Sequence, residues 1–450
     1  MKIIIAGAED IGAHLATLLS KEDNDIILLD DDDEKLTNAT DNLDIMTLNV
    51  SPTSINGLKE AGTSRAGLFI AATPSETCNM TCCMLAHSLG AAKTVACIDN
   101  AEYILPHHRE FFASMGVESL IYPQMLAAKE IVEGVKRSWV RQYWEVHDGA
   151  LVILGIKLRD VSQPLLGQPL RDLCPSDAPY HIVAIKRGEA TIIPGGNDVL
   201  CVGDIAYFMT TKTFVSTLRH LVGKDTADYP DIHRIMIMGG GDVAVETCHL
   251  LPDHIHATLL EVDRARCRKL SELLSADETS IVNGDGRDMQ LLQDEGIEHH
   301  EAFCALTRDT ENNILACLAA KRMGVRKTVA LIENTDYISL AERLDIGTII
   351  NTKQLAAAHI YRMMLASDAR SVKNLTIADA DVCEFVATEG SLVTRRPVMA
   401  LGLPAGITIG GIVRDGKGQL CNGRTQIIPG DHVVVFVLTS MFQKVDKFFR

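Results

Sequence analysis

The chain contains one short pattern twice: an apolar strand, a glycine-rich turn and a segment of helical character. The first turn reads Gly7-Ala8-Glu9-Asp10-Ile11-Gly12 and follows Ile3-Ile4-Ile5. The second reads Gly239-Gly240-Gly241-Asp242-Val243-Ala244 and follows Ile235-Met236-Ile237. A turn of this kind at the start of a helix presents free backbone N–H groups to an anion. The pattern therefore predicts two Rossmann-like units, each with a place for nucleotide phosphates.

A second strand that ends in an acidic residue follows each turn. Asp30 ends the run Ile26-Ile27-Leu28-Leu29, and Glu261 ends the run Thr258-Leu259-Leu260. An acid at this distance from the turn is expected to accept hydrogen bonds from the ribose hydroxyls of a dinucleotide. The acidic residues that follow Asp30 argue against the 2′-phosphate of NADP in the first unit, because like charges repel.

The two glycine turns differ at their middle position. The second turn fits G-x-G-x-x-A, whereas Glu9 stands in the first turn where the middle glycine is expected. A side chain there fills space that a pyrophosphate needs. Two negative charges about 4 Å apart also repel by roughly 4 kcal/mol at an effective dielectric constant near 20. We therefore expect the second unit to hold the working nucleotide site, and the first to be weakened, empty or altered in ligand.

The duplication extends along the whole chain in nearly constant register. The segment 68–73 matches 303–307, and 90–96 matches 324–330. Collinear matches of this length indicate an internal repeat. Within each unit apolar strands alternate with helical stretches, which predicts a parallel sheet with helices on both faces. In each sheet, the carboxyl ends of the strands should border one crevice. Thr73 lies at such an end in the first unit, and Thr307 lies at the matching end in the second.

Short β-type runs with turn signals follow each unit. The predicted fold class is therefore α/β, with two Rossmann-like doubly wound parallel sheets, each followed by a small β-rich α+β subdomain, as an internal duplication. A linker is expected at 224–231, where three aspartates and Pro230 interrupt regular structure. The expected domains are 1–123 (first Rossmann-like domain), 124–223 (linker helix and first β-rich subdomain), 232–352 (second Rossmann-like domain) and 353–450 (linker helix and second β-rich subdomain).

Charge and composition narrow the possible partners. The formal net charge of −16 argues against nucleic acid and is compatible with the basic cytoplasmic loops of a membrane protein. No uncharged apolar run is long enough to cross a membrane. The twelve cysteines lack metal-finger spacing, so we interpret them as core thiols. We interpret the acidic run Asp31–Asp33 as a solvated surface. Neither a metal site nor a catalytic residue is expected.

Both glycine turns and both terminal acids belong to one larger pattern. It also includes Thr73 with Asn79, Thr307 with Asn313, the Gly284-Asp285 step and two C-terminal strands that follow Pro-Gly turns. In these features the chain resembles the family of peripheral regulators of Trk potassium uptake systems, which are tandems of RCK (also called KTN) domains. The resemblance implies a cytoplasmic homo-tetramer or dimer, peripheral on the inner face of the cell membrane. Its partner would be a membrane potassium channel-like subunit of the TrkH or TrkG type. The regulator would gate this subunit by a conformational change when it binds NAD(H), or ATP and ADP.

The resemblance also assigns nucleotide contacts. In the second unit Glu261 would bind ribose, Asp285 would meet the adenine edge, and Thr307 would line the crevice floor. In the first unit Leu48 stands at the glycine of the Gly-Asn/Asp step, and Cys97 stands where the family often has arginine. The complete set of assigned contacts is Gly239, Gly240, Gly241, Asp242, Val243, Glu261, Asp285 and Thr307 in the second unit, and Gly7, Ala8, Asp10, Ile11, Asp30, Asn49 and Thr73 in the first.

Two other functions stay open at this point. An NAD-dependent oxidoreductase would need an acid or base that faces the nicotinamide. The histidines of the β-rich subdomains, such as His181 and His432, show no partner pattern, and His181 has no counterpart in the second half. A nucleotide-sensing scaffold that is not tied to transport is the other alternative. The repeat therefore favours a regulatory protein over an enzyme.

Overall fold

A computed structural model describes residues 1–20, 24–40, 45–158, 164–175, 177–188, 190–222, 231–364, 369–374, 380–438 and 441–449. The predicted linker at 224–231 lies outside these residues except for its last position. The chain divides into two compact units. Unit 1 contains Met1–Ala127 and Asn351–Met364, and unit 2 contains Ala128–Ile350 and Leu365–Arg450. Among the described residues, no helix is long and apolar enough to cross a membrane.

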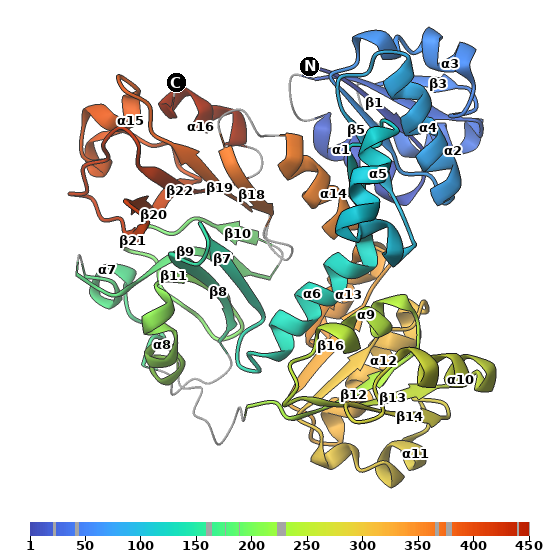
Figure 1. Cartoon of the computed structure of the whole chain (residues 1–450). Helices are drawn as coiled ribbons and strands as arrows, with labels where there is room; N and C mark the ends of the chain where they lie inside the picture. Colours follow the sequence, from blue (N-terminus) through green and yellow to red (C-terminus); the bar gives the residue numbers. More distant parts are fainter. Residues whose placement is uncertain are drawn as a thin grey trace. The chain divides into compact units, whose positions relative to one another are not determined.

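Unit 1 is built around a parallel six-stranded sheet in the order β3-β2-β1-β4-β5-β6 (Figure 1). The order reverses between β1 and β4, which is the switch point where open α/β sheets bind ligands. The strands are β1 (Lys2–Ala6), β2 (Asp25–Asp30), β3 (Met46–Asn49), β4 (Leu68–Ala71), β5 (Thr94–Cys97) and β6 (Ser119–Ile121). The helices are α1 (Asp10–Leu19), α2 (Asp33–Thr40), α3 (Ile55–Glu60), α4 (Glu76–Ser88) and α5 (Pro106–Ser114), and α6 (Pro123–Val135) follows the sheet.

The second Rossmann-like sheet, in unit 2, has the same six-stranded order, β14-β13-β12-β15-β16-β17. This identity of order confirms the predicted duplication of a doubly wound fold. Its strands are β12 (Arg234–Met238), β13 (His256–Glu261), β14 (Thr279–Asn283), β15 (Ala302–Ala305), β16 (Lys327–Leu331) and β17 (Thr348–Ile350). Its helices are α9 (Asp242–Leu250), α10 (Arg264–Leu273), α11 (Met289–Asp294), α12 (Thr310–Arg322) and α13 (Asp336–Arg343).

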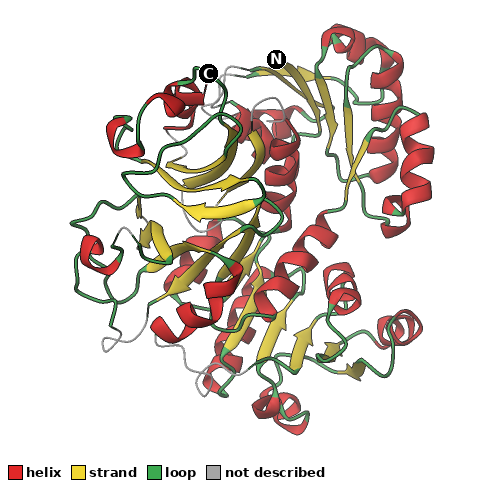
Figure 2. Ribbon diagram, turned by 60° about the vertical axis from the view of Figure 1, so that its left-hand side comes forward, coloured by secondary structure: helices red, strands yellow, loops and turns green. Residues whose placement is uncertain are grey.

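The two β-rich subdomains, both in unit 2, also share one topology. Their antiparallel sheets run β10-β9-β11-β8-β7 and β21-β20-β22-β19-β18. Figure 2 shows the strands of the chain in yellow and the helices in red. The strands are β7 (Gln142–Val146), β8 (Leu151–Lys157), β9 (Tyr180–Arg187), β10 (Ala190–Ile192), β11 (Ile205–Thr210), β18 (Ala369–Asn374), β19 (Ala380–Val386), β20 (Ile407–Arg414), β21 (Lys417–Leu420) and β22 (His432–Leu438). The accompanying helices are α7 (Leu170–Leu173), α8 (Val215–Leu221), α15 (Leu392–Arg395) and α16 (Phe442–Phe449).

Matched ion pairs and a shared core stabilise these subdomains. Arg187 binds Asp204, and Arg414 binds Asp431, each through two hydrogen bonds of 2.7–2.9 Å. Both aspartates are almost fully buried, so each buried charge has the bidentate partner that it requires. Apolar side chains of the two sheets form a single cluster, to which Tyr207 and Phe436 both belong.

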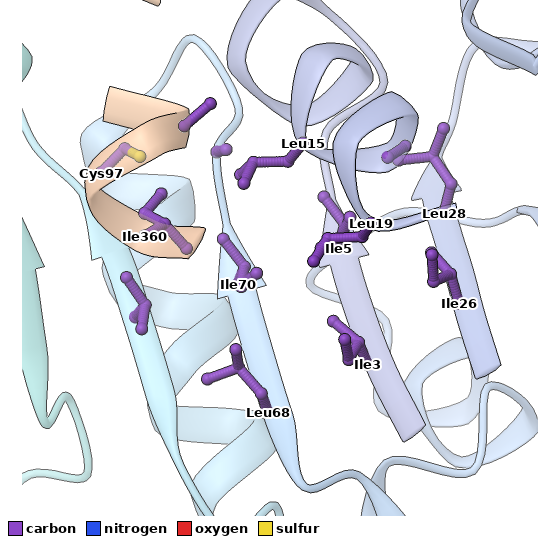
Figure 3. Close-up of a cluster of buried hydrophobic side chains, with 14 of the residues drawn as sticks. Ile3, Ile5, Leu15, Leu19, Ile26, Leu28, Leu68, Ile70, Cys97 and Ile360 are labelled. Atoms are coloured by element: carbon purple, nitrogen blue, oxygen red, sulfur yellow. The ribbon is translucent and has the colours of Figure 1, made fainter. Parts of the chain in front are cut away.

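One helix departs from the expected domain order. Helix α14 (Thr352–Met364), which follows the second Rossmann-like sheet, packs on α1 of the first. Its residues Ala356, Ala357 and Ile360 are fully buried in the same core as Ile5 and Leu15 (Figure 3). A segment from the second half of the chain therefore completes the core of unit 1.

Candidate nucleotide-binding crevices

The second glycine turn has a backbone that requires glycine at its first position. Gly239 has φ of +99°, and a Cβ atom there would lie 2.8 Å from the Cγ2 atom of Thr307. Gly241 ends the turn and precedes α9 without a side-chain cap, so the first N–H groups of this helix remain available to an anion. A Cβ atom on Gly241 would meet only the carbonyl oxygen of Leu306, at 3.9 Å. A Cβ atom at Gly241 therefore has room, on the side of the turn where the phosphates are predicted.

The terminal acid of each unit is bound to its own glycine turn. Glu261 accepts hydrogen bonds from the N–H groups of Gly240 (2.7 Å) and Asp263 (2.8 Å). Asp30 accepts equivalent bonds from Ala8 (2.8 Å) and Asp32 (3.0 Å). An ionised carboxylate has about four acceptor sites, so these bonds leave capacity for ribose hydroxyls. Both acids therefore fix the shape of the turn and lie where the sequence analysis placed them.

A threonine and a buried asparagine are hydrogen-bonded at the strand ends of each unit, where the crevice is expected. The Oδ1 atom of Asn313 accepts from the Thr307 hydroxyl (2.6 Å) and N–H (3.2 Å). Its Nδ2 atom donates to the carbonyls of Thr307 and Leu331, both at 2.8 Å. Asn79 makes the same four contacts in unit 1, with Thr73 and Cys97. This amide ties β15 to β16, or β4 to β5, at the strand ends.

Replacing Asn313 with alanine is expected to lower the free energy of unfolding of unit 2 by about 3 kcal/mol, because buried backbone groups lose their partners. Urea unfolding followed by tryptophan fluorescence measures this, since Trp139 and Trp144 both lie in unit 2. The half-buried neighbour Asn312 serves as the control, with an expected loss below about 1 kcal/mol on its replacement by alanine. Equal losses for both variants would contradict a special role for Asn313.

The strand register changes one equivalence drawn from the sequence. Asn49 pairs with Asp30 as Asn283 pairs with Glu261, so these two asparagines correspond. The residue that matches Gly284 is therefore Val50, not Leu48, since the N–H groups of Val50 and Gly284 donate to the carbonyls of Asp30 and Glu261. It follows that Ser51 stands where the second unit has Asp285. Asn49 itself donates to Asp33 at 3.3 Å.

Asp285 lies on the loop after β14 and is engaged by a residue that the sequence analysis missed. The Arg287 guanidinium contacts the Asp285 carboxylate at 2.7 Å, and this hydrogen bond lowers the pKa of Asp285. Arg287 also donates to Asn312. Arg287 follows Asp285 by two residues, and an arginine can fold back onto an aspartate at that separation. This spacing was the signal that the sequence offered. A ligand that bonds to Asp285 would have to share this carboxylate with Arg287.

The charge on Glu9 has a partner in the structure. The Nζ atom of Lys35, on α2, lies 2.5 Å from the Glu9 carboxylate, and this hydrogen bond raises the pKa of Lys35. The expected repulsion between Glu9 and a phosphate is therefore offset in part. The bulk of the side chain remains, because Glu9 is the residue that immediately precedes α1. Lys35 was missed because it directly follows a run of acidic residues, Asp30 to Glu34.

The position of Cys97 does not distinguish the two units. Ala96 pairs with Ala71 as Ala330 pairs with Ala305, so Leu331 is the counterpart of Cys97. Both side chains are buried, and burial raises the pKa of the Cys97 thiol to about 12. A neutral residue therefore occupies this place in both crevices.

The remaining assigned residues lie at the turns. Gly7 has φ of +106°, and a Cβ atom on it would lie 2.8 Å from the carbonyl oxygen of Ala72. Ile11 packs against the core of unit 1, and Val243 is buried in α9. Asp10 begins α1, and its side chain lies outside the described part of the chain. Asp242 accepts a hydrogen bond from Arg266.

Arg266 brings positive charge to the second glycine turn. Its Nε atom donates to the carbonyl of Gly240 at 2.7 Å, and its Nη2 atom donates to Asp242 at 3.1 Å. These two bonds hold the Arg266 guanidinium on the turn. Guanidinium groups suit phosphate oxygens in charge and geometry.

A glycine-turn Rossmann sheet followed by an antiparallel β subdomain, present twice, defines the chain as a tandem of RCK-type folds. A solved structure described as the GsuK RCK domain shares this fold with a TM-score of 0.61 at 16% sequence identity, covering 100% of this chain and 94% of that one. The GsuK channel bound to NAD also has a TM-score of 0.61 at 16% identity, covering 100% of this chain and 78% of that one.

Sequence relatives then give the family. The TrkA-N domain profile matches residues 3–123 and 235–352. The Trk system potassium uptake protein TrkA of Halomonas elongata is 30% identical over 100% of this chain and 99% of its own length. The protein of the same name from Haemophilus influenzae is 30% identical with the same coverage. The chain belongs to the TrkA family.

Proposed function

We propose that this protein is a nucleotide-binding regulatory subunit of a Trk-type potassium uptake system. The observation that carries the proposal is the complete set of supporting contacts around the second crevice, in a chain that belongs to the TrkA family. Glu261 fixes the turn through Gly240, Asn313 fixes Thr307, and the start of α9 is uncapped. The names of the relatives support potassium uptake as the process.

NAD(H) is the proposed ligand of the second crevice, with ATP or ADP as a second nucleotide of the same site. The residues fit a dinucleotide, because Gly241 leaves space for phosphates and Arg266 adds positive charge. Glu261 would accept from ribose hydroxyls, and its charge would oppose a 2′-phosphate. Asp285 would bond the adenine edge. We propose a weaker or altered site in the first unit, at Gly7, Ala8, Asp10, Ile11, Asp30, Asn49 and Thr73.

The proposed regulation is a shift between two conformations. A ligand moves such an equilibrium only by its different affinity for the two states. The glycine turn follows β12, and Thr307 follows β15, so one ligand that contacts both would hold these strand ends in one arrangement. The β-rich subdomains would carry that difference to neighbouring subunits. No residue acts as an acid or base in this scheme, so we propose a regulator and not an enzyme.

The proposed assembly is a cytoplasmic homo-tetramer or dimer, peripheral on the inner face of the cell membrane. Its partner is a membrane potassium channel-like subunit of the TrkH or TrkG type. The net charge of −16 suits the basic loops that such subunits carry on the cytoplasmic side. The four domains 1–123, 124–223, 232–352 and 353–450 are part of this proposal, with α14, at the start of the last domain, packed on the first.

The test is flux through a reconstituted Trk membrane subunit with and without the full chain. We expect co-purification of the two proteins and a rubidium flux that changes when NADH, NAD⁺, ATP or ADP is added. NADPH should act more weakly. Nucleotide binding without association or change in flux would favour a scaffold that is not tied to transport. Oxidation of NADH by added carbonyl compounds, followed by absorbance, would favour an oxidoreductase.

A further inference from the structure

Two histidines and a buried glutamate, none of them assigned to a crevice, meet within unit 2. They are His147, Glu384 and His432, and one ligand atom of each lies within 4.8 Å of the others. The Nδ1 atom of His147 is 2.7 Å from the Glu384 carboxylate, and the Nδ1 atom of His432 is 3.0 Å from the same oxygen. We propose that these three side chains bind a divalent transition-metal ion of the zinc type.

The fold brings the three residues together from both β-rich subdomains. Glu384 on β19 pairs with Val434 of β22, and His432 lies two residues before Val434. Glu384 and His432 are therefore diagonal neighbours on one face of the sheet. This face also presents Phe436 to the core that the two sheets share. His147 comes from the turn between β7 and β8 of the other sheet.

The backbone at His147 is unusual. His147 has φ of +47°, a left-handed conformation that residues other than glycine rarely adopt. This conformation costs free energy and persists where the surrounding structure determines it. Here it accompanies an imidazole that contacts the carboxylate of Glu384. The two imidazole rings also lie close together, with centroids 4.4 Å apart.

Hydrogen bonding within the protein does not satisfy the whole cluster. Glu384 is only 3% exposed, so its charge needs a partner. His147 supplies one hydrogen bond. The Nδ1 atom of His432 is buried and has no hydrogen-bond partner among the described residues, although it lies near the same oxygen. A metal ion between the three groups would bind this nitrogen and would compensate the negative charge of the Glu384 carboxylate.

The donor set selects the class of ion. Two imidazoles and one carboxylate match the ligands of zinc sites, which lie about 2.0–2.2 Å from the metal and leave a fourth position for water. Calcium and magnesium require mainly oxygen ligands, and this cluster has one carboxylate. We therefore expect Zn²⁺ to bind, and Ca²⁺ and Mg²⁺ not to compete.

The site should occur once per chain, in contrast to the duplicated fold. Alignment of Gly203-Asp204 with Gly430-Asp431 places Ile205 at the position of His432. The pairing of Tyr207 with Gly155 then places Gly155 at the position of Glu384. Neither residue can bind a metal through its side chain. The sequence alone predicts no metal site and no partner for His432, because the partners of His432 are distant in the chain.

Isothermal titration of the metal-free full chain with Zn²⁺ tests the proposal. We expect one saturable site per chain at low micromolar Zn²⁺ or below. Glu384→Gln and His432→Gln should each weaken it by more than the roughly 10–100-fold that loss of an outer-shell partner costs. His299→Gln removes a histidine that is 70% exposed beside Glu298 and should change nothing. Absence of a saturable site in the wild-type chain overturns the proposal, whatever the variants do.

Two further measurements separate this site from the cysteines. Co²⁺ bound at the site should show a visible spectrum of nitrogen and oxygen ligands, and Zn²⁺ should raise the melting temperature of the wild type but not of Glu384→Gln. A thiolate charge-transfer band, unchanged Zn²⁺ binding by both variants, or equal binding of Ca²⁺ would each overturn the assignment. Circular dichroism of each variant confirms that it is folded before titration.

Discussion

Gly241→Glu is expected to lower the affinity of the second crevice for NADH by at least about 100-fold. The substitution copies Glu9 of the first turn into the second. The φ of Gly241 is −72°, which any residue adopts, and its Cβ direction is open, so the fold should be retained. The new side chain would occupy the space in front of α9 and bring a negative charge toward the phosphates. Titration of the full chain with NADH, followed by nucleotide fluorescence, measures the loss.

Matched variants separate charge from bulk and test both crevices. Gly241→Ala should cost little, because a Cβ atom there has room. Gly241→Gln should show the effect of bulk alone. The reciprocal variant Glu9→Gly removes the side chain and releases Lys35, so binding in unit 1 should increase. Unchanged NADH affinity in Gly241→Glu would show that the second turn does not face the phosphates, whatever Glu9→Gly does.

Ile360→Ala is expected to lower the free energy of unfolding of unit 1 by about 2–5 kcal/mol, although residue 360 follows the second Rossmann-like sheet. Ile360 is fully buried on α14 against the core that includes Leu15 and Leu19 (Figure 3). Removal of the isoleucine side chain leaves a cavity, and the surrounding packed core closes this cavity only in part. Hydrogen exchange of the α1 amides measures the stability of unit 1 directly.

Tryptophan fluorescence provides an internal comparison for this variant. Trp139 and Trp144 are the only tryptophans, and both lie in unit 2. The loss of stability that the tryptophans report in urea should therefore be smaller than the loss that hydrogen exchange of the α1 amides reports. Ile360→Val, with an expected cost of about 0.5–1.5 kcal/mol, is the conservative control. Exchange at α1 that is unchanged in Ile360→Ala would contradict the assignment of α14 to this core.

The sheet order could be predicted from sequence because its signals are local. An apolar strand, a glycine turn and a terminal acid lie within about 30 residues, and the repeat supplied each signal twice. The position of α14 could not be predicted, because an apolar helix face such as that of Ile360 does not indicate which sheet it covers. The sequence placed α14 as a linker to the second β-rich subdomain, whereas the structure packs it on α1.

Only some residues of the crevices could be predicted from sequence, for a similar reason. Glu261, Asp30 and Thr307 follow motif spacing and lie at the strand ends as expected. The pairing of Glu9 with Lys35 and the match of Val50 to Gly284 depend on a helix position and on strand register, which the spacing of residues does not contain. The cluster at His147 depends on contact between two subdomains, over a separation of 237 residues from Glu384.

The placement of α14 also sets an order of events during synthesis. Residues 1–127 leave the ribosome first, yet their core needs Ala356, Ala357 and Ile360. At about 5–20 residues per second, the ribosome needs roughly 10–50 s to produce the intervening chain. During that time the face of α1 that α14 covers is exposed in a nascent chain. Unit 1 is therefore the first part to be made and among the last to be completed, and its apolar face is a natural binding place for a chaperone.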